Sequence, residues 1–154
     1  MAFDAFLKIE GIPGESTDKR HPGEIEVLSF SWGVSNSATS GGGGGGGAGK
    51  AALKEFVIVK LMDTASPLLF ESCCKGEHIR TADFTLVDRS SGLAFYKIHF
   101  DDVLVSSLQP ASAPGGGAAL ESLSFNVEKL TITAQDTKGN TTSIECFAHG
   151  AVAH

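Results

Sequence analysis

Residues 24–36 read Glu-Ile-Glu-Val-Leu-Ser-Phe-Ser-Trp-Gly-Val-Ser-Asn, and apolar residues alternate with polar ones through most of this stretch. Alternation with a period of two is typical of a β-strand, so the stretch predicts one long strand. The apolar positions change parity between Val27 and Leu28, which predicts a β-bulge inside the strand. We expect water on the opposite face, which is small and polar and carries Ser29, Ser31, Gly33 and Ser35.

The same alternation recurs along the chain, with glycine-, proline- or asparagine-rich turns between the repeats. Strands are predicted at residues 3–10, 24–36, 52–62, 79–88, 93–105, 120–134 and 141–148. Within 120–134 the apolar phase shifts before Leu130 and Ile132, which predicts a second bulge. Residues 11–23 and 106–119 are predicted loops, and 136–140 a hairpin turn.

One short helix is predicted over residues 67–75. Ser66 is its expected N-cap, and Pro67 suits the first helical position, where its missing N–H costs nothing. Lys75 favours the negative C-terminal end, and Gly76 supplies the left-handed stop.

These elements predict a mainly β chain. Long antiparallel strands without alternating helices favour a β-barrel-like, two-sheet fold with one short helix and an extended glycine-rich loop. The length of 154 residues fits a single domain over residues 1–154. The strand edges need closing or pairing, and pairing with a neighbouring copy would give an oligomer.

Composition disfavours several function classes. The net charge of −6, from 12 basic and 18 acidic residues, argues against a nucleic-acid binder. No stretch approaches the ~20 apolar residues of a membrane helix, so we expect no membrane insertion. The N-terminal residues lack a basic region and a long apolar core, so no signal peptide is expected. Three cysteines with no C-x-x-C pair favour free thiols and synthesis in a reducing compartment.

No catalytic, metal-binding or cofactor-binding residues are predicted, so we expect neither an enzyme nor a cofactor. Gly44–Lys50 satisfies G-x-x-x-x-G-K, yet Ala51 follows in place of a hydroxyl residue, and a strand follows in place of a helix. Asp101 and Asp102 are adjacent on a strand and would point to opposite faces. The five histidines are scattered without metal-ligand spacing.

Several short motifs, in order, resemble the haemolysin-coregulated protein family of the bacterial type VI secretion system. They cover nearly the whole chain: Phe6-Leu7-Lys8-Ile9, Gly14-Glu15-Ser16, Asp18-Lys19, His21, Glu24-Ile25-Glu26-Val27-Leu28, Ser31-Trp32-Gly33-Val34-Ser35, Ala48-Gly49-Lys50, Ser66-Pro67, Gly76, His78, Asp102-Val103-Leu104-Val105-Ser106-Ser107, Leu123-Ser124-Phe125 and Lys129. The chain departs from the family at Glu77, where a lysine is usual, and in the Pro/Ala/Gly-rich stretch 108–119.

The resemblance implies the structural subunit of a secreted tube. Six copies would form a ring, and rings would stack inside a contractile sheath behind a spike of the valine–glycine-repeat (VgrG) type. Small effector proteins would bind in the lumen. The protein would be made in the bacterial cytoplasm without a signal peptide and be secreted to the extracellular space or a target cell.

The resemblance also implies two sets of site residues. The ring-stacking loop would comprise Gly41, Gly42, Gly43, Gly44, Gly45, Gly46, Gly47, Ala48, Gly49 and Lys50. Ser31 would contact cargo in the lumen together with its neighbours Ser29 and Ser35; a merely solvated strand face is the alternative.

Two other hypotheses remain at this stage. The chain could be a monomeric β-sandwich binding module without catalysis, although Trp32 and Tyr96, its only Trp and Tyr, both fall on mainly apolar faces. It could also be an enzyme that uses the glycine loop or Cys73. The solution mass separates the tube subunit from the first, and nucleotide titration tests the second.

Overall fold

The computed structural model describes residues 2–36, 51–112 and 115–148, and it confirms a mainly β fold with one helix. In chain order the elements are β1 (Phe3–Ile9), β2 (Ile25–Val27), β3 (Ser29–Ser31), β4 (Val34–Asn36), β5 (Ala51–Leu53), β6 (Phe56–Leu61), α1 (Ala65–Lys75), β7 (His78–Asp88), β8 (Ala94–Ser112), β9 (Ala119–Gln135) and β10 (Thr141–Phe147).

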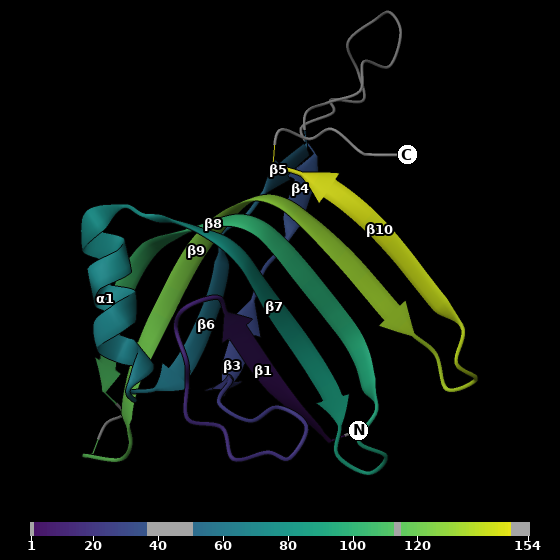
Figure 1. Ribbon diagram of the computed structural model, residues 1–154, viewed down its shortest axis with the longest axis horizontal. Coiled ribbons are helices and arrows are strands. Elements are labelled where there is room, and N and C mark those ends of the chain that lie inside the picture. Colours follow the sequence, from purple (N-terminus) through teal and green to yellow (C-terminus); the bar gives the residue numbers. More distant parts are fainter. Residues whose placement is uncertain (1, 37–50, 113–114, 149–154) are drawn as a thin grey trace, which may run out of the picture.

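The strands form one large curved sheet and one small sheet. The large sheet runs β2-β1-β7-β8-β9-β6-β3, with β10 added on β9, and the small sheet pairs β4 with β5. All of these pairings are antiparallel. Figure 1 shows the long strands β7, β8 and β9 curling together, with α1 at one side of the curl. The predicted barrel-like, two-sheet architecture is therefore confirmed.

The stretch 24–36 closes this barrel, and it does so in three strands, not in the single bulged strand we predicted. β2 pairs with β1 at one edge of the large sheet, whereas β3 pairs with β6 at the other. Only Leu28 separates β2 from β3, and its N–H donates to the Val59 carbonyl at 2.8 Å. The change of parity therefore marks the point where the chain crosses from one sheet edge to the other.

The predicted loop over 106–119 is wrong, because β8 continues to Ser112 and β9 begins at Ala119. Pro110 suggested a loop, since proline cannot donate to a sheet ladder. At this level, however, β8 has β9 as its partner, with Pro110 opposite Glu121, whereas its pairing with β7 ends at Leu104. One side of the strand needs no donor there, so the proline is tolerated.

A strand boundary and the position of a bulge also differ from the predictions. The predicted strand 52–62 is interrupted between β5 and β6, where the Lys54 N–H donates to the Gly33 carbonyl at 2.9 Å. The second bulge lies on β8, between Val105 and Ser107, and not within 120–134. The apolar phase shift before Leu130 has a different cause. Both β8 and β9 change the set of residues that points into the core at this level, and on β8 the change occurs at Asp102, whose φ is 57°.

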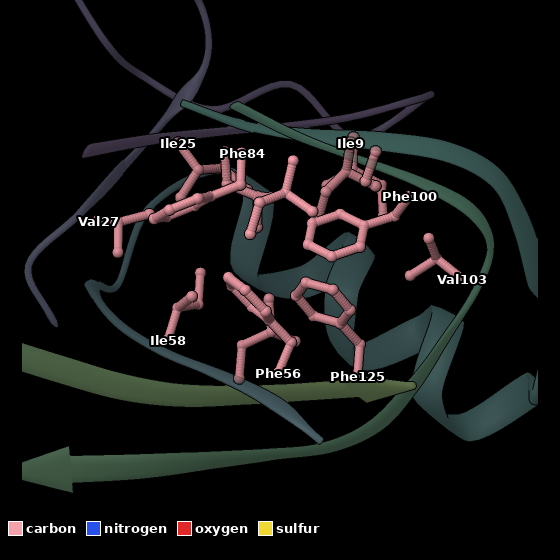
Figure 2. Packing of buried hydrophobic residues seen from close by; sticks show 14 of the residues in the cluster. Ile9, Ile25, Val27, Phe56, Ile58, Phe84, Phe100, Val103 and Phe125 are labelled. Carbon is pink, nitrogen blue, oxygen red and sulfur yellow. The ribbon is translucent and has the colours of Figure 1, made fainter. Parts of the chain in front are cut away.

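The core is a cluster of aromatic and branched side chains inside the curl. Figure 2 shows Phe56, Phe100 and Phe125 close together across the barrel interior. Phe56 lies 5.0 Å from each of the other two rings, measured between centroids, and all three residues are at most 4% exposed. Trp32 stacks on Phe56, with 5.1 Å between the ring centroids. Aromatic pairs at these separations each add to the free energy of burial.

The helix starts earlier than predicted and is capped differently. Its N-cap is Thr64, without a side-chain capping bond, and Ser66 lies inside the first turn, so the predicted Ser66 cap is wrong. The Asp63 carboxylate accepts the Ala65 N–H at 2.9 Å instead. Gly76, with φ of 63°, ends the helix as predicted, because its left-handed conformation lets its N–H reach the Cys73 carbonyl.

Candidate functional site

An apolar groove of about 430 Å³ lies where the barrel opens, between the β4–β5 hairpin, called the arm below, and strands β9 and β10. Its wall includes Trp32, Val34, Leu53, Val127, Ile144 and Cys146. Val34 is 61% exposed and Ile144 is 49% exposed. Lys54 and Glu128 add charge to an otherwise apolar lining. These exposed apolar side chains make the groove the candidate binding site of the described chain.

The groove exists because the barrel does not close at this end. β10 pairs with β9, where Ile144 lies opposite Ile132, and the arm forms a sheet of its own. Figure 1 shows the arm and the end of β10 at the same end of the molecule. Val34 shares the apolar parity of Phe30 and Trp32 in the sequence, and in the structure it lines this groove and is exposed.

The three serines proposed for cargo contact are all exposed. Ser29 and Ser31 are the first and last residues of β3, and Ser35 is in β4. Across from them on β6, Val59 pairs with Ser29 and Val57 with Ser31. The expectation that this face meets water is confirmed for the three serines, whereas Gly33 is half-buried and lines the groove. No contact among the described residues assigns the serines a ligand. The predicted ring-stacking loop, Gly41–Lys50, lies outside the described residues.

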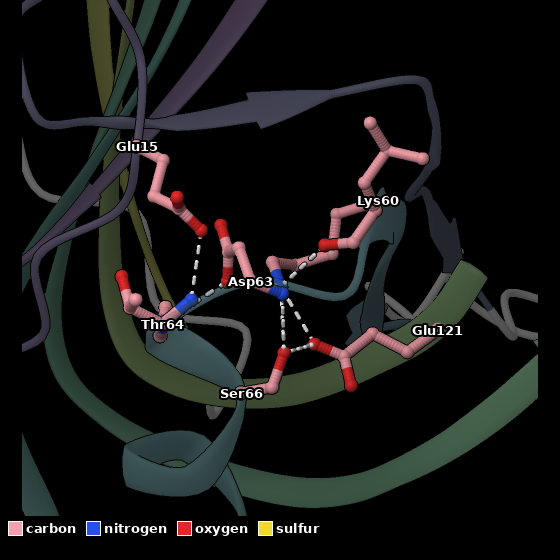
Figure 3. Close-up of polar contacts among 8 residues, drawn as sticks. Glu15, Lys60, Asp63, Thr64, Ser66 and Glu121 are labelled. Atoms are coloured by element: carbon pink, nitrogen blue, oxygen red, sulfur yellow. Dashed lines mark hydrogen bonds and ion pairs between the residues drawn. The ribbon is translucent and has the colours of Figure 1, made fainter. Parts of the chain in front are cut away.

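A buried charged network, absent from the sequence predictions, lies where β6 meets α1 (Figure 3). The Lys60 side chain is 0% exposed, and its Nζ donates to Glu121 Oε1 at 2.6 Å and to Asp63 Oδ1 at 2.8 Å. It also donates to the Leu61 carbonyl at 2.9 Å. Ser66 Oγ donates to Glu121 Oε1 at 2.5 Å. A buried charge is tolerated when ion pairs and hydrogen bonds compensate it in this way.

The network fixes the start of the helix against the sheet. Glu121 lies opposite Lys60 in the β6–β9 pairing, so both side chains point to the same face. Glu15, from the loop after β1, accepts the Thr64 N–H at 2.9 Å. One signal in the sequence could have revealed Lys60, because it shares the parity of the buried Phe56 and Ile58 in β6. A lysine on the inward face of a strand requires a buried acidic partner.

A second group of charges lies on the outer face of β7 and β8. His99 Nδ1 lies 2.6 Å from Asp83 Oδ1, and His99 Nε2 lies 3.3 Å from Asp101 Oδ1. The hydrogen bond to Asp83 is the main cause that raises the pKa of His99 above its ordinary value of 6.5. Asp102 turns to a different partner, His78, at 2.7 Å. The two aspartates therefore have separate partners, in keeping with their expected divergence.

The described residues contain no group of three or more His, Cys, Asp or Glu side chains that could hold a metal ion. Cys73, Cys74 and Cys146 are free thiols. His78, which follows the helix that carries Cys73, is paired with Asp102. Across the described ranges, no helix is both long and apolar enough to cross a membrane.

Comparison with known proteins identifies relatives over nearly the whole chain. Residues 6–134 match the family described as "Type VI secretion system effector, Hcp". Protein hcp1 of Pseudomonas aeruginosa is 35% identical over 144 residues, which cover 91% of this chain and 88% of that protein.

Solved structures agree with this match. The crystal structure of Hcp1 from Salmonella typhimurium has a TM-score of 0.84 and 31% identity, and covers 99% of both chains. A structure described as a type six secretion system protein has a TM-score of 0.88 and 32% identity, and covers 95% of this chain and 96% of that one. The chain therefore belongs to the Hcp family of type VI secretion system effectors.

Proposed function

We propose that this chain is the structural subunit of a type VI secretion tube. Six copies form a ring, and rings stack into a tube that a contractile sheath surrounds and a VgrG-type spike tips. The observation that carries the proposal is the likeness to Hcp1 of Salmonella typhimurium, which extends over 99% of both chains at a TM-score of 0.84. No separate domain is needed for this role, so residues 1–154 act as one unit.

Exposed apolar side chains support assembly into a larger particle. The groove beside the arm leaves Val34 and Ile144 in water in an isolated subunit. Burial of apolar surface is the main favourable term in association, at about 25 cal/mol per Å². A neighbouring copy that covers this groove removes the unfavourable exposure, and a ring provides such a neighbour for every subunit.

Negative-stain imaging of the purified protein tests the ring. We expect annular particles with an open centre. Compact particles of the size of one 16.0 kDa chain, at all concentrations examined, would contradict the proposal.

We further propose that Gly41–Lys50 reaches the adjacent ring. These residues connect β4 to β5 in the sequence, and the run of seven glycines makes few side-chain demands on a partner surface. Deletion of Gly41–Gly47 should leave rings intact but reduce their stacking into tubes. Tubes of unchanged length from the deletion variant would contradict this role.

We propose that Ser29, Ser31 and Ser35 contact small effector proteins in the lumen before secretion out of the cell. Their support is their exposure on a face of small side chains, which lets another protein approach the strand closely. Ser31→Lys should abolish co-purification of a lumen effector, whereas Thr142→Lys, at an exposed position on β10, serves as the matched control. Equal effector recovery from both variants would contradict the assignment.

A further inference from the structure

The groove beside the arm differs from other depressions of the described surface in how few charged side chains line it. Of the described residues in its wall, only Lys54 and Glu128 carry a charge, and Asn126 adds an amide. Four other depressions are each lined by several charged residues. A concave apolar wall with few polar groups is typical of a small-molecule site, and the groove volume of about 430 Å³ lies in the usual range of roughly 300–1,000 Å³.

The groove reaches the aromatic core of the barrel. Phe100 and Phe125 belong to its wall, and each of these residues is only 1% exposed. Phe56, which contacts both of these rings, also belongs to the wall, as does Trp32, whose ring stacks on Phe56. The wall therefore extends from the exposed Val34 to buried rings. An apolar group that enters the groove exchanges contact with water for contact with aromatic carbon, which is favourable.

Lys54 adds a positive charge to this apolar wall. Its backbone N–H donates to the Gly33 carbonyl at 2.9 Å, which fixes its position at the base of the arm. A Cβ atom built on Gly33 would lie 3.6 Å from Lys54 Cδ, so the aliphatic part of the lysine runs beside the groove lining. The residue is exposed, and within the described part of the chain its ammonium has no ion-pair partner.

The two charged groups of the wall differ in how they are engaged. Glu128 has a further interaction of its own, so the charge left available to a ligand is that of Lys54. An ammonium group binds a carboxylate through charge-assisted hydrogen bonds. A ligand with an apolar body and one carboxylate therefore complements both the wall and its lysine.

We propose that the groove binds an apolar carboxylate of the medium-chain fatty acid type. The alkyl chain lies against the aromatic wall, and the carboxylate accepts hydrogen bonds from Lys54 Nζ. All of the residues that carry this site belong to one subunit, so the inference does not rest on the proposed ring. A neighbouring copy that covers the same groove would compete with the ligand.

The two parts of the ligand contribute unequally to its affinity. Burial of the alkyl chain against the wall supplies most of it, because the favourable free energy grows with the apolar area removed from water. The ion pair with the exposed Lys54 supplies less, since an ion pair in contact with water is weak. The chain therefore decides whether the ligand binds, and the lysine decides which head group is preferred.

Cys146 allows the binding of decanoate to be measured on the full, unmodified chain. Its free, half-buried thiol lines the groove, whereas Cys73 and Cys74 belong to α1. A titration followed by the fluorescence of Trp32 gives the dissociation constant. At about ten times that concentration, decanoate should slow the alkylation of Cys146 by iodoacetamide about tenfold, because only the free groove reacts.

The two helix thiols are the internal control for this experiment. Mass spectrometry of the peptides should show unchanged alkylation of Cys73 and Cys74 in the presence of decanoate. Slower alkylation of Cys146 alone supports the inference. Unchanged alkylation of Cys146 at every protein concentration, or equal slowing of all three thiols, overturns it.

The head group is tested with three ligands of equal chain length. Decanoate should bind the wild type more tightly than decanol, and decanol more tightly than decylammonium. Lys54→Gln should weaken decanoate binding about threefold and leave decanol binding unchanged. Lys97→Gln, at an exposed position of β8 outside the groove, is the matched control and should change neither. Decylammonium binding as tight as that of decanoate, or equal effects of the two substitutions, would contradict the assigned head group.

Native mass spectrometry of the same samples separates this inference from the proposed ring. Protection of Cys146 with loss of hexamers would support both the ligand site and a neighbour that covers the groove. Protection with intact hexamers would support the ligand site and contradict the covering neighbour. Intact hexamers without any protection by decanoate would overturn the ligand site and leave the ring standing.

Discussion

The two ends of strand β6 differ in what surrounds their inward-facing side chains. Near its last residue, the charged Lys60 is buried among acceptors that this chain provides itself, Glu121, Asp63 and the Leu61 carbonyl. Near its first residue, the aromatic core around Phe56 opens through Trp32 into an apolar groove. The inward side of one end is paired within a single subunit, whereas at the other end Val34 and Ile144 are exposed.

This comparison separates two kinds of expected effect, one on stability and one on association. Changes in the closed interior should alter the free energy of unfolding of the subunit. Changes in the open groove should leave that free energy nearly unchanged and alter association instead.

The largest effect is expected from the aromatic core. Phe125→Ala removes a ring that is 1% exposed and contacts both Phe56 and Phe100. We expect a loss of about 3–5 kcal/mol in the free energy of unfolding, measured by urea denaturation, because a cavity remains beside the lost contacts. Ile144→Ala in the groove is the control and should cost below about 1 kcal/mol. Equal losses from both variants would contradict the division into a closed and an open end.

The buried network should show strong coupling. Glu121→Leu leaves the Lys60 charge short of its closest partner and should cost about 3–5 kcal/mol. The double variant Lys60→Met/Glu121→Leu removes both charges and should cost less than the sum of the two single variants. Additive losses in a double-mutant cycle would show that the two groups do not form a pair.

The open end can be followed through Trp32, the single tryptophan of the chain. Because it lines the groove, we expect its fluorescence to be shielded from acrylamide quenching in the assembled particle and to become accessible on dissociation. Val34→Asp should favour the dissociated, quenchable form while the unfolding midpoint of the subunit stays close to that of the wild type. Quenching that is independent of assembly would place the interface elsewhere.

The smallest effect concerns His99, whose side chain is 43% exposed. Its folded pKa lies above its ordinary 6.5, chiefly through the hydrogen bond to Asp83. The stabilisation is therefore fully present below about pH 6.5 and is lost as the pH rises through the raised folded pKa. We expect the unfolding midpoint to fall slightly from pH 6 to about pH 8, and His99→Gln to remove this slope. An unchanged slope in His99→Gln would contradict the assignment.

The sequence predicts the regular parts of this fold better than the closure. Period-two alternation located the long strands, and Gly76 located the end of the helix, because both signals are local. The crossing at Leu28 depends on which distant strands accept β2 and β3, so the parity change was interpreted as a bulge. Pro110 was interpreted as a loop signal. A strand tolerates proline on a side where it has no paired neighbour, and the sequence does not reveal which side of β8 that is.

The candidate surfaces were only partly predictable. The exposure of Ser29, Ser31 and Ser35 followed from their alternation with apolar residues. Val34 and Leu28 share the apolar parity of Phe30 and Trp32, yet they are exposed. Alternation identifies a shared face and not what covers it. The groove and the Lys60 network combine residues far apart in the chain, beyond the reach of a local pattern.

The central claim, that this chain is a ring-forming tube subunit, is tested most directly by native mass spectrometry of the purified protein. The account predicts a dominant species at six times the 16.0 kDa chain mass. A clean monomer at both low and high protein concentration would contradict it.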